Sequence, residues 1–83
     1  MKQKVAVVAL HTKNGEVKPL FIVWDNHVKY PIDRIVRKEK AASLKSGGFG
    51  IRYTIRIENH QRYLYYENPG WFIEKPDHSL ANN

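Results

Sequence analysis

Short apolar runs of strand length, separated by turn residues, follow one another along most of this 83-residue chain. Residues 51–58 alternate strictly between apolar and polar side chains, and residues 5–10 and 19–24 are continuous apolar runs rich in β-branched residues. A period of two, with turn signals about every 8 to 12 residues, is typical of small sandwiches and barrels. The sequence therefore predicts an all-β fold: a small six-stranded barrel or two-layer sandwich built from consecutive antiparallel hairpins.

Turn residues predict where the hairpins lie. Asn14 and Gly15 give the strongest short-range hairpin signal, because a type I′ turn needs positive φ at both central residues. This turn would place Val7 opposite Ile22 and Val8 opposite Phe21. Further turns are expected at residues 25–27, with Asn26 left-handed, and at residues 59–60 and 68–70.

The segments around residues 31–46 are less regular. Pro31 cannot donate to a ladder, so its strand should form an edge or bend away. Residues 37–46 contain good helix formers before Gly47, and we expect an irregular segment with at most one helical turn, confined to residues 39–45. The pattern leaves open whether this segment is helical or irregular.

The chain length fits one domain, which we place at residues 1–75, followed by a disordered tail at residues 76–83. It contains no cysteine, which excludes disulfides and thiolate metal sites. The first apolar run is too short for a signal peptide or a membrane span, so we expect a cytoplasmic protein without membrane association.

Residues that would carry catalysis or hold a metal are not arranged for either task. The four histidines are too far apart in sequence for a ligand pair: His11, His27, His60 and His78. No serine lies in a nucleophile-elbow context, and paired carboxylates are scarce. The sequence predicts a non-enzymatic protein with no cofactor and no metal site.

The positive charge is concentrated in one segment. The net charge is +6, and residues 34–62 hold eight basic residues against two acidic ones. A local positive field attracts polyanions, although a net charge of this size also keeps small proteins soluble. The candidate nucleic-acid-binding residues are Arg34, Arg37, Lys38, Lys40, Lys45, Arg52, Arg56, Tyr63 and Tyr65.

Four of these candidates share one face of the predicted hairpin of residues 51–67: Arg52, Arg56, Tyr63 and Tyr65. Aromatic rings beside cations are the parts that β surfaces use to stack bases and neutralise phosphates. The alternative is ordinary cross-strand packing. If Glu58 pairs with Gln61, Arg52 would pair with Glu67 and Arg56 would stack on Tyr63.

A protein-interaction role is the second interpretation. Residues 5–10 and 19–24 are apolar on both faces of the first hairpin. The outer face, with Val8 and Phe21, needs cover from a second layer, a protein partner or another copy of the chain. This would make the protein a homodimer or an accessory subunit.

Several motifs resemble a family of small uncharacterised bacterial all-β proteins: PLFIVW at 19–24, YPIDRI at 30–35, AASLKSGGFGIRYT at 41–54 and WFIE at 71–74. The resemblance covers about residues 4–75. Some members resemble short open reading frames that neighbour translesion-type DNA polymerases. It therefore implies a small β domain and, by association only, a nucleic-acid context.

Overall fold

A computed structural model describes the chain over residues 2–42, 49–68 and 70–74. These residues contain no helix, which confirms the all-β fold, and they form seven strands, one more than expected. The strands are β1 (Gln3–His11), β2 (Val17–Val23), β3 (Lys29–Pro31), β4 (Arg34–Ala42), β5 (Phe49–Ile57), β6 (His60–Glu67) and β7 (Gly70–Glu74). The predicted tail at residues 76–83 lies outside the described residues.

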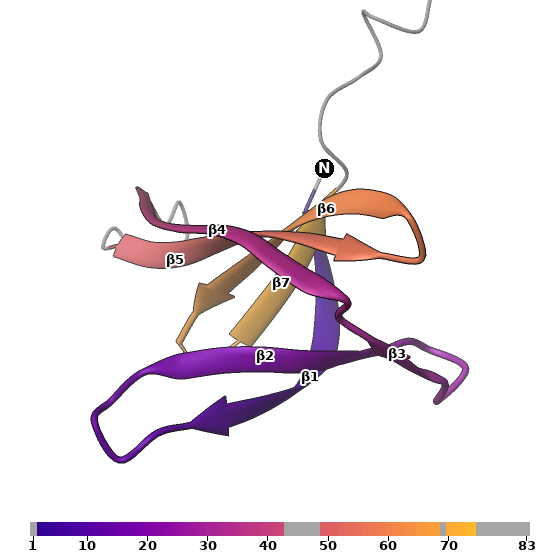
Figure 1. Ribbon diagram of the computed structural model, residues 1–83, viewed down its shortest axis with the longest axis horizontal. Helices are drawn as coiled ribbons and strands as arrows, with labels where there is room; N and C mark the ends of the chain where they lie inside the picture. The colour runs from indigo at the N-terminus through magenta and orange to yellow at the C-terminus, as the bar shows by residue number, and fades with distance from the viewer. Residues whose placement is uncertain (1, 43–48, 69, 75–83) are drawn as a thin grey trace, which may run out of the picture.

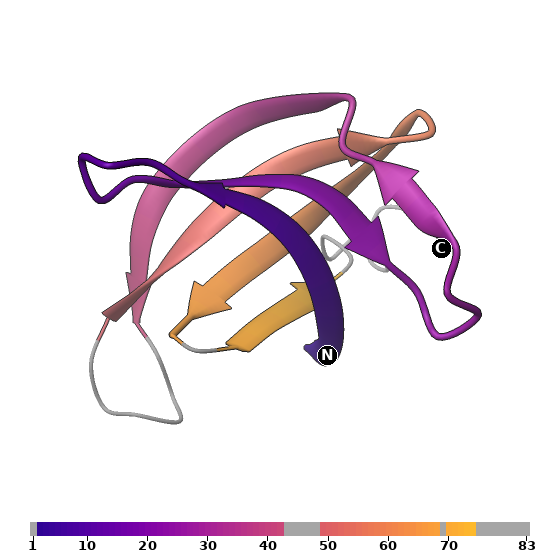
Figure 2. The ribbon, with the colours of Figure 1, turned by 90° about the horizontal axis from the view of Figure 1, so that it is seen from below.

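The strands form one antiparallel sheet in the order β3-β2-β1-β7-β6-β5-β4. Strand β1 serves both halves of the sheet, because residues 3–5 pair with β7 and residues 6–11 pair with β2. The sheet curls into a half-barrel in which the β1 and β2 hairpin faces the long strands β4 to β6 (Figures 1 and 2). Consecutive hairpins therefore build most of the sheet, as predicted.

The first hairpin has the predicted pairing in its centre and a different turn. Val7 pairs with Ile22 and Val8 with Phe21, as expected. The turn is longer than a type I′ turn: the Gly15 amide donates to the Thr12 carbonyl, and only Gly15 has a positive φ, 88°. The longer loop shifts the pairing by one residue, and a bulge at Leu20 of β2, opposite the step from Val8 to Ala9, restores it.

The second turn has the predicted three-residue length. The Trp24 amide donates to the Val28 carbonyl, and Asn26 Oδ1 accepts a hydrogen bond from the Val28 amide. The left-handed residue is His27, with φ of 64°, so the prediction of Asn26 at that position was wrong. Asn26 uses its side chain to hold the turn instead. Pro31 ends β3, which is an edge strand as predicted.

The β5 and β6 hairpin has the predicted faces with a different register. Its turn consists of Glu58 and Asn59, which both have positive φ, so Ile57 pairs with His60. The expected turn at residues 59–60 was therefore one residue late, which shifts every cross-strand partner by two. A shift of two preserves the face of each side chain because strands alternate with a period of two.

Residues 34–42 form β4, so the expectation of an irregular or helical segment was wrong within the described residues. Pairing with β5 along its length outweighs the helix propensity of this stretch. The register shifts between Ile35 and Arg37, which leaves Val36 without a partner on β5. Residues 43–46 of the predicted segment lie outside the described residues.

The core lies on the inner side of the curled sheet. Its most buried members come from β2 and β5 to β7: Ile22, Tyr53, Ile55, Leu64, Trp71 and Ile73. The chain between β3 and β4 closes one corner, because the Ile32 amide donates to the Leu20 carbonyl of β2 and the Asp33 amide to the Arg56 carbonyl of β5. The opposite side of the sheet, which we call the outer face, carries the candidate interface.

Candidate nucleic-acid interface

The register of β4 to β6 determines which predicted residues share the outer face. Ile35 pairs with Ile55 in the core, so the neighbouring pair, Arg34 and Arg56, points outward. Because Val36 forms a bulge, Arg37 also lies on the outer face, opposite Thr54. Six of the nine predicted residues share this face: Arg34, Arg37, Arg52, Arg56, Tyr63 and Tyr65.

The remaining three predicted residues are not on the outer face. Lys38 pairs with Tyr53 and lies on the inner side, with its ammonium 5.9 Å from the centre of the Tyr53 ring. Lys40 alternates with Lys38 onto the same side, opposite Ile51. Lys45 lies outside the described residues. The basic segment is thus divided between two faces of the edge strand.

Three exposed arginines form what we call the arginine cluster: Arg34, Arg37 and Arg56. Arg34 and Arg56 are direct cross-strand partners, which places two like charges side by side. Like charges in this position repel each other and lower the stability of a sheet. Arg56 donates one hydrogen bond, 3.2 Å long, to the Asn59 carbonyl. None of the three arginines forms an ion pair with a carboxylate of the described residues, although Glu39 acts on Arg37 at longer range.

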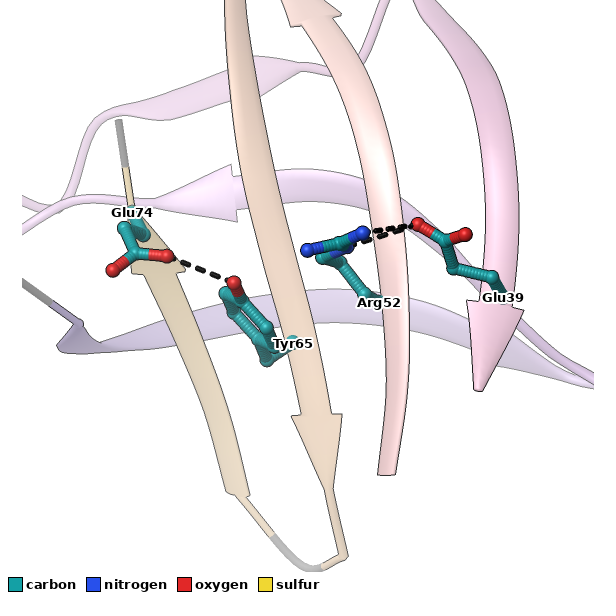
Figure 3. Close-up of polar contacts among 4 residues, drawn as sticks. All are labelled: Glu39, Arg52, Tyr65 and Glu74. Atoms are coloured by element: carbon teal, nitrogen blue, oxygen red, sulfur yellow. Dashed lines mark hydrogen bonds and ion pairs between the residues drawn. The ribbon is translucent and has the colours of Figure 1, made fainter. Parts of the chain in front are cut away.

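A polar row crosses the outer face beside the arginine cluster and contains Glu39, Arg52, Tyr65 and Glu74 (Figure 3). Arg52 Nε donates to Glu39 Oε2 over 3.0 Å, and the Tyr65 hydroxyl donates to Glu74 Oε1 over 2.8 Å. The first contact joins β5 to β4, and the second joins β6 to β7. Each row residue predicted to bind nucleic acid, Arg52 and Tyr65, thus already has an acidic partner.

Hydrogen bonds and burial shift the pKa values of three members of the polar row. The Arg52 guanidinium holds the pKa of the Glu39 carboxyl below its ordinary value, and the same hydrogen bonds raise the pKa of Arg52. Burial, followed by the hydrogen bond to Glu74, raises the pKa of the Tyr65 hydroxyl. Glu39 and Arg52 therefore stay charged, and Tyr65 stays neutral, around neutral pH.

Lys2 covers one end of the polar row. Its ammonium lies 3.9 Å from the centre of the Tyr65 ring and 2.8 Å from Glu67 Oε2. Tyr65 is only 7% exposed. This ring is therefore covered by the chain itself and offers little surface for a base. The sequence had predicted Tyr65 as a residue that stacks on a base.

Tyr63 remains the more accessible of the two tyrosines. It is half-buried and pairs with Thr54, which in turn pairs with Arg37 of the arginine cluster. The guanidinium of Arg52 lies 4.8 Å from the centre of the Tyr63 ring. Neither cross-strand contact expected from the sequence forms: Arg52 bonds to Glu39 rather than Glu67, and Arg56 lies opposite Gln61 rather than Tyr63.

Three residues that shape this face were not among the predicted ones: Lys2, Glu39 and Glu74. Glu39 was hidden because its segment was interpreted as irregular, so no strand partner was assigned to it. With residues 34–42 aligned as a strand, the alternation of Arg37 and Glu39 would have placed a carboxylate beside Arg52. Lys2 directly precedes β1 and Glu74 is the last residue of β7, so strand alternation alone did not assign a partner to either.

Within residues 2–42, 49–68 and 70–74, no three His, Asp or Glu side chains are grouped so that they could hold a metal ion. Over the same part of the chain, no helix has the length and apolar character needed to cross a membrane. A cytoplasmic location stays a prediction.

Comparisons with known proteins give no further assignment. No protein-family profile, no curated protein and no solved structure matches the chain. The resemblance to small bacterial β proteins stays a prediction, and any function has to be argued from the geometry of the outer face.

Proposed function

We propose that this protein is a non-enzymatic binding module that holds single-stranded nucleic acid against its outer face. The contact surface is the arginine cluster of Arg34, Arg37 and Arg56, together with the neighbouring ring of Tyr63. Phosphates bind the arginines, and a base stacks on Tyr63 or on the guanidinium of Arg52 beside it.

The observation that carries this proposal is the direct cross-strand pairing of Arg34 with Arg56. Both side chains are exposed, and neither forms an ion pair with a carboxylate of the described residues. Two cations in this position cost stability when no anion is bound. A phosphate between them removes the repulsion and gains two charge-assisted hydrogen bonds.

Elsewhere on the outer face, basic side chains form ion pairs with carboxylates. Glu39 neutralises Arg52, and Glu67 neutralises Lys2. Arg34 and Arg56 have no such ion pair among the described residues, and Glu39 acts on Arg37 only at longer range, so the positive field of this face is strongest at the cluster. Because the positive charge is concentrated on β4 and β5, a polyanion should bind along these two strands rather than equally well over the whole face.

The proposal is tested with a fluorescently labelled single-stranded oligonucleotide and a double variant, Arg34→Gln with Arg56→Gln. Its matched control is Lys13→Gln with Lys29→Gln, which changes the net charge equally at two exposed lysines outside the cluster. We expect the arginine variant to lose at least about tenfold in affinity by anisotropy, since each phosphate contact is charge-assisted. The lysine variant should lose much less.

The same double variant gives an independent readout of stability. Removing the like-charge pair should raise the free energy of unfolding by a few tenths to about 1 kcal/mol, which is measured as a higher urea midpoint. The affinity for the oligonucleotide should fall in the same variant. Equal losses of affinity in the arginine and lysine variants would reduce the cluster to a solubility feature and reject the proposed function.

A second candidate function rests on the first hairpin. Val8 and Leu10, on the outer face of β1, are 37% and 50% exposed, and Phe21 and Val23 lie beside them on β2. No second layer of the described residues covers this apolar surface, which fits the contact face of a second copy of the chain. The protein would then act as a homodimeric accessory subunit.

A further inference from the structure

A small cavity opens on the inner side of the half-barrel, between the turn after β2 and the tip of the β5 and β6 hairpin. Its volume is about 210 Å³. Ile22 and Ile73, which are both buried, form its base, and Trp24 and Tyr30 form an aromatic wall. Whole ligands usually occupy pockets of roughly 300 to 1,000 Å³, so this cavity fits part of a larger ligand, such as one nucleobase with the beginning of the group attached to it.

Arg62 gives the cavity its charge. It lines the cavity from a core-facing position of β6, where it pairs with the fully buried Ile55. Its Nη1 donates to the Gln61 carbonyl over 2.8 Å. No carboxylate in the described ranges forms an ion pair with its guanidinium. A half-buried cation facing a core is unfavourable unless an anion compensates it.

The aromatic wall, formed by Trp24 and Tyr30, is accessible to a ligand. Trp24 is 36% exposed although it stands at the edge of the core, and Tyr30 is held over the inner face because it pairs with Ile22. His60 and Glu58 complete the rim from the tip of the β5 and β6 hairpin. A flat ring between the aromatic side chains would cover them, and the Glu58 carboxylate can accept a hydrogen bond from an amino group on that ring.

We propose that this cavity binds one nucleotide unit, with the base against Trp24 and Tyr30 and a phosphate on Arg62. The inference rests on the proposed function, because it assigns the cavity to one nucleotide of the bound single strand. The hairpin tip connects the two sites: Arg56 of the arginine cluster pairs with Gln61, the residue before Arg62. A strand that crosses this tip contacts both faces of the sheet.

The test follows tryptophan emission while a short single-stranded oligoadenylate is added, with adenosine monophosphate as a second probe. Trp24 is the exposed indole, and Trp71 is only 8% exposed, so quenching should come mainly from Trp24. We expect the oligoadenylate to quench the emission, and Trp24→Leu to abolish that change. Arg62→Gln should lower the affinity for the oligoadenylate about tenfold, because the charge-assisted contact with one phosphate is lost.

Two controls separate the cavity from the outer face. Lys29→Gln removes a charge next to Tyr30 but outside the cavity lining, and it should leave quenching unchanged. Arg34→Gln with Arg56→Gln should weaken the binding of the oligoadenylate and leave the binding of adenosine monophosphate unchanged. Circular dichroism and urea unfolding of Arg62→Gln show whether that variant is folded, and a folded variant with full affinity overturns the assignment of the phosphate.

The outcomes distinguish failure of the cavity from failure of the proposed function. Binding of oligoadenylate that depends on Arg34 and Arg56 but leaves the emission unchanged overturns the cavity alone. No binding of oligoadenylate at low salt, measured by anisotropy, overturns both proposals. Adenosine monophosphate that binds as tightly as the oligoadenylate overturns the assignment to a strand, because the cavity would then serve a free nucleotide.

Discussion

The hydroxyl group of Tyr53, on β5, donates a hydrogen bond to the main-chain carbonyl of Val17, on β2. These strands lie in opposite halves of the curled sheet and are not paired with each other. Tyr53 is 1% exposed and packs against Trp71 in the core, so the hydroxyl spans the gap from the inside. This contact holds the two halves of the half-barrel together where no ladder does.

Replacing this tyrosine by phenylalanine tests the contact. Tyr53→Phe removes the donor and leaves the Val17 carbonyl without it, which should lower the free energy of unfolding by about 1 to 2 kcal/mol. Urea denaturation measures the loss, and Tyr63→Phe, on the outer face, is the matched control. Equal midpoints for the two variants would show that the gap is held by packing alone.

The two buried tyrosines, Tyr53 and Tyr65, make the stability of the protein fall at high pH. Burial raises the pKa of the Tyr53 hydroxyl, and burial together with Glu74 raises that of Tyr65. The folded state therefore holds these protons more tightly than the unfolded chain does. Their contribution to stability is complete below a pH of about 10, the ordinary tyrosine pKa, and is lost as the pH rises through the raised values.

The measurement is a titration of phenolate absorbance in the folded protein and in urea. The chain has five tyrosines, and the folded curve should contain a late fraction that the unfolded curve lacks. Tyr53→Phe should remove part of that fraction. Superimposable curves for the folded and unfolded chain would contradict the role of burial.

The turn of the first hairpin depends on one glycine. Gly15 has a φ of 88°, a conformation that a β-branched residue adopts only under strain, whereas Asn14 has no positive φ. We therefore expect Gly15→Val to lower stability by about 1 kcal/mol or more. Asn14→Ala should cost clearly less in the same urea experiment. Comparable costs for the two substitutions would indicate the type I′ turn that the sequence suggested, because both positions have positive φ in that turn.

The apolar outer face of the first hairpin predicts the oligomeric state under the second candidate function. If a second copy covers this face, Val8→Glu with Phe21→Glu should convert a dimer into a folded monomer. Light scattering measures the mass, and circular dichroism confirms the fold. A wild-type protein that is already monomeric at high concentration would exclude the dimer.

The sequence allows the faces of most strands to be predicted, but not all of their partners. Alternation placed Tyr53 and Ile55 inward and Arg52 and Tyr63 outward, and the structure agrees. The register of that hairpin was wrong by two, because Glu58, rather than His60, takes part in the turn, and a glutamate at positive φ carries no turn signal.

The candidate site was harder to predict because it depends on β4. Local propensity in residues 39–42 favours helix, and only the pairing with β5 makes a strand of it. The bulge at Val36 then decides that Arg37 joins Arg34 on the outer face. A bulge has no sequence signature here, so the cluster could not be assembled from the sequence, although its arginines were all named.

The central claim is that the arginine cluster binds phosphates of a single strand while Tyr63 stacks a base. The most direct test is the affinity for a single-stranded oligonucleotide as a function of salt. Arg56→Ala should weaken binding and reduce the slope of log K against log salt by about 1, because one phosphate contact and its counterion are lost. Tyr63→Ala should lower the affinity by about 1 to 3 kcal/mol and leave the slope nearly unchanged. A slope that Arg56→Ala does not alter, or that Lys13→Ala alters equally, would contradict the account.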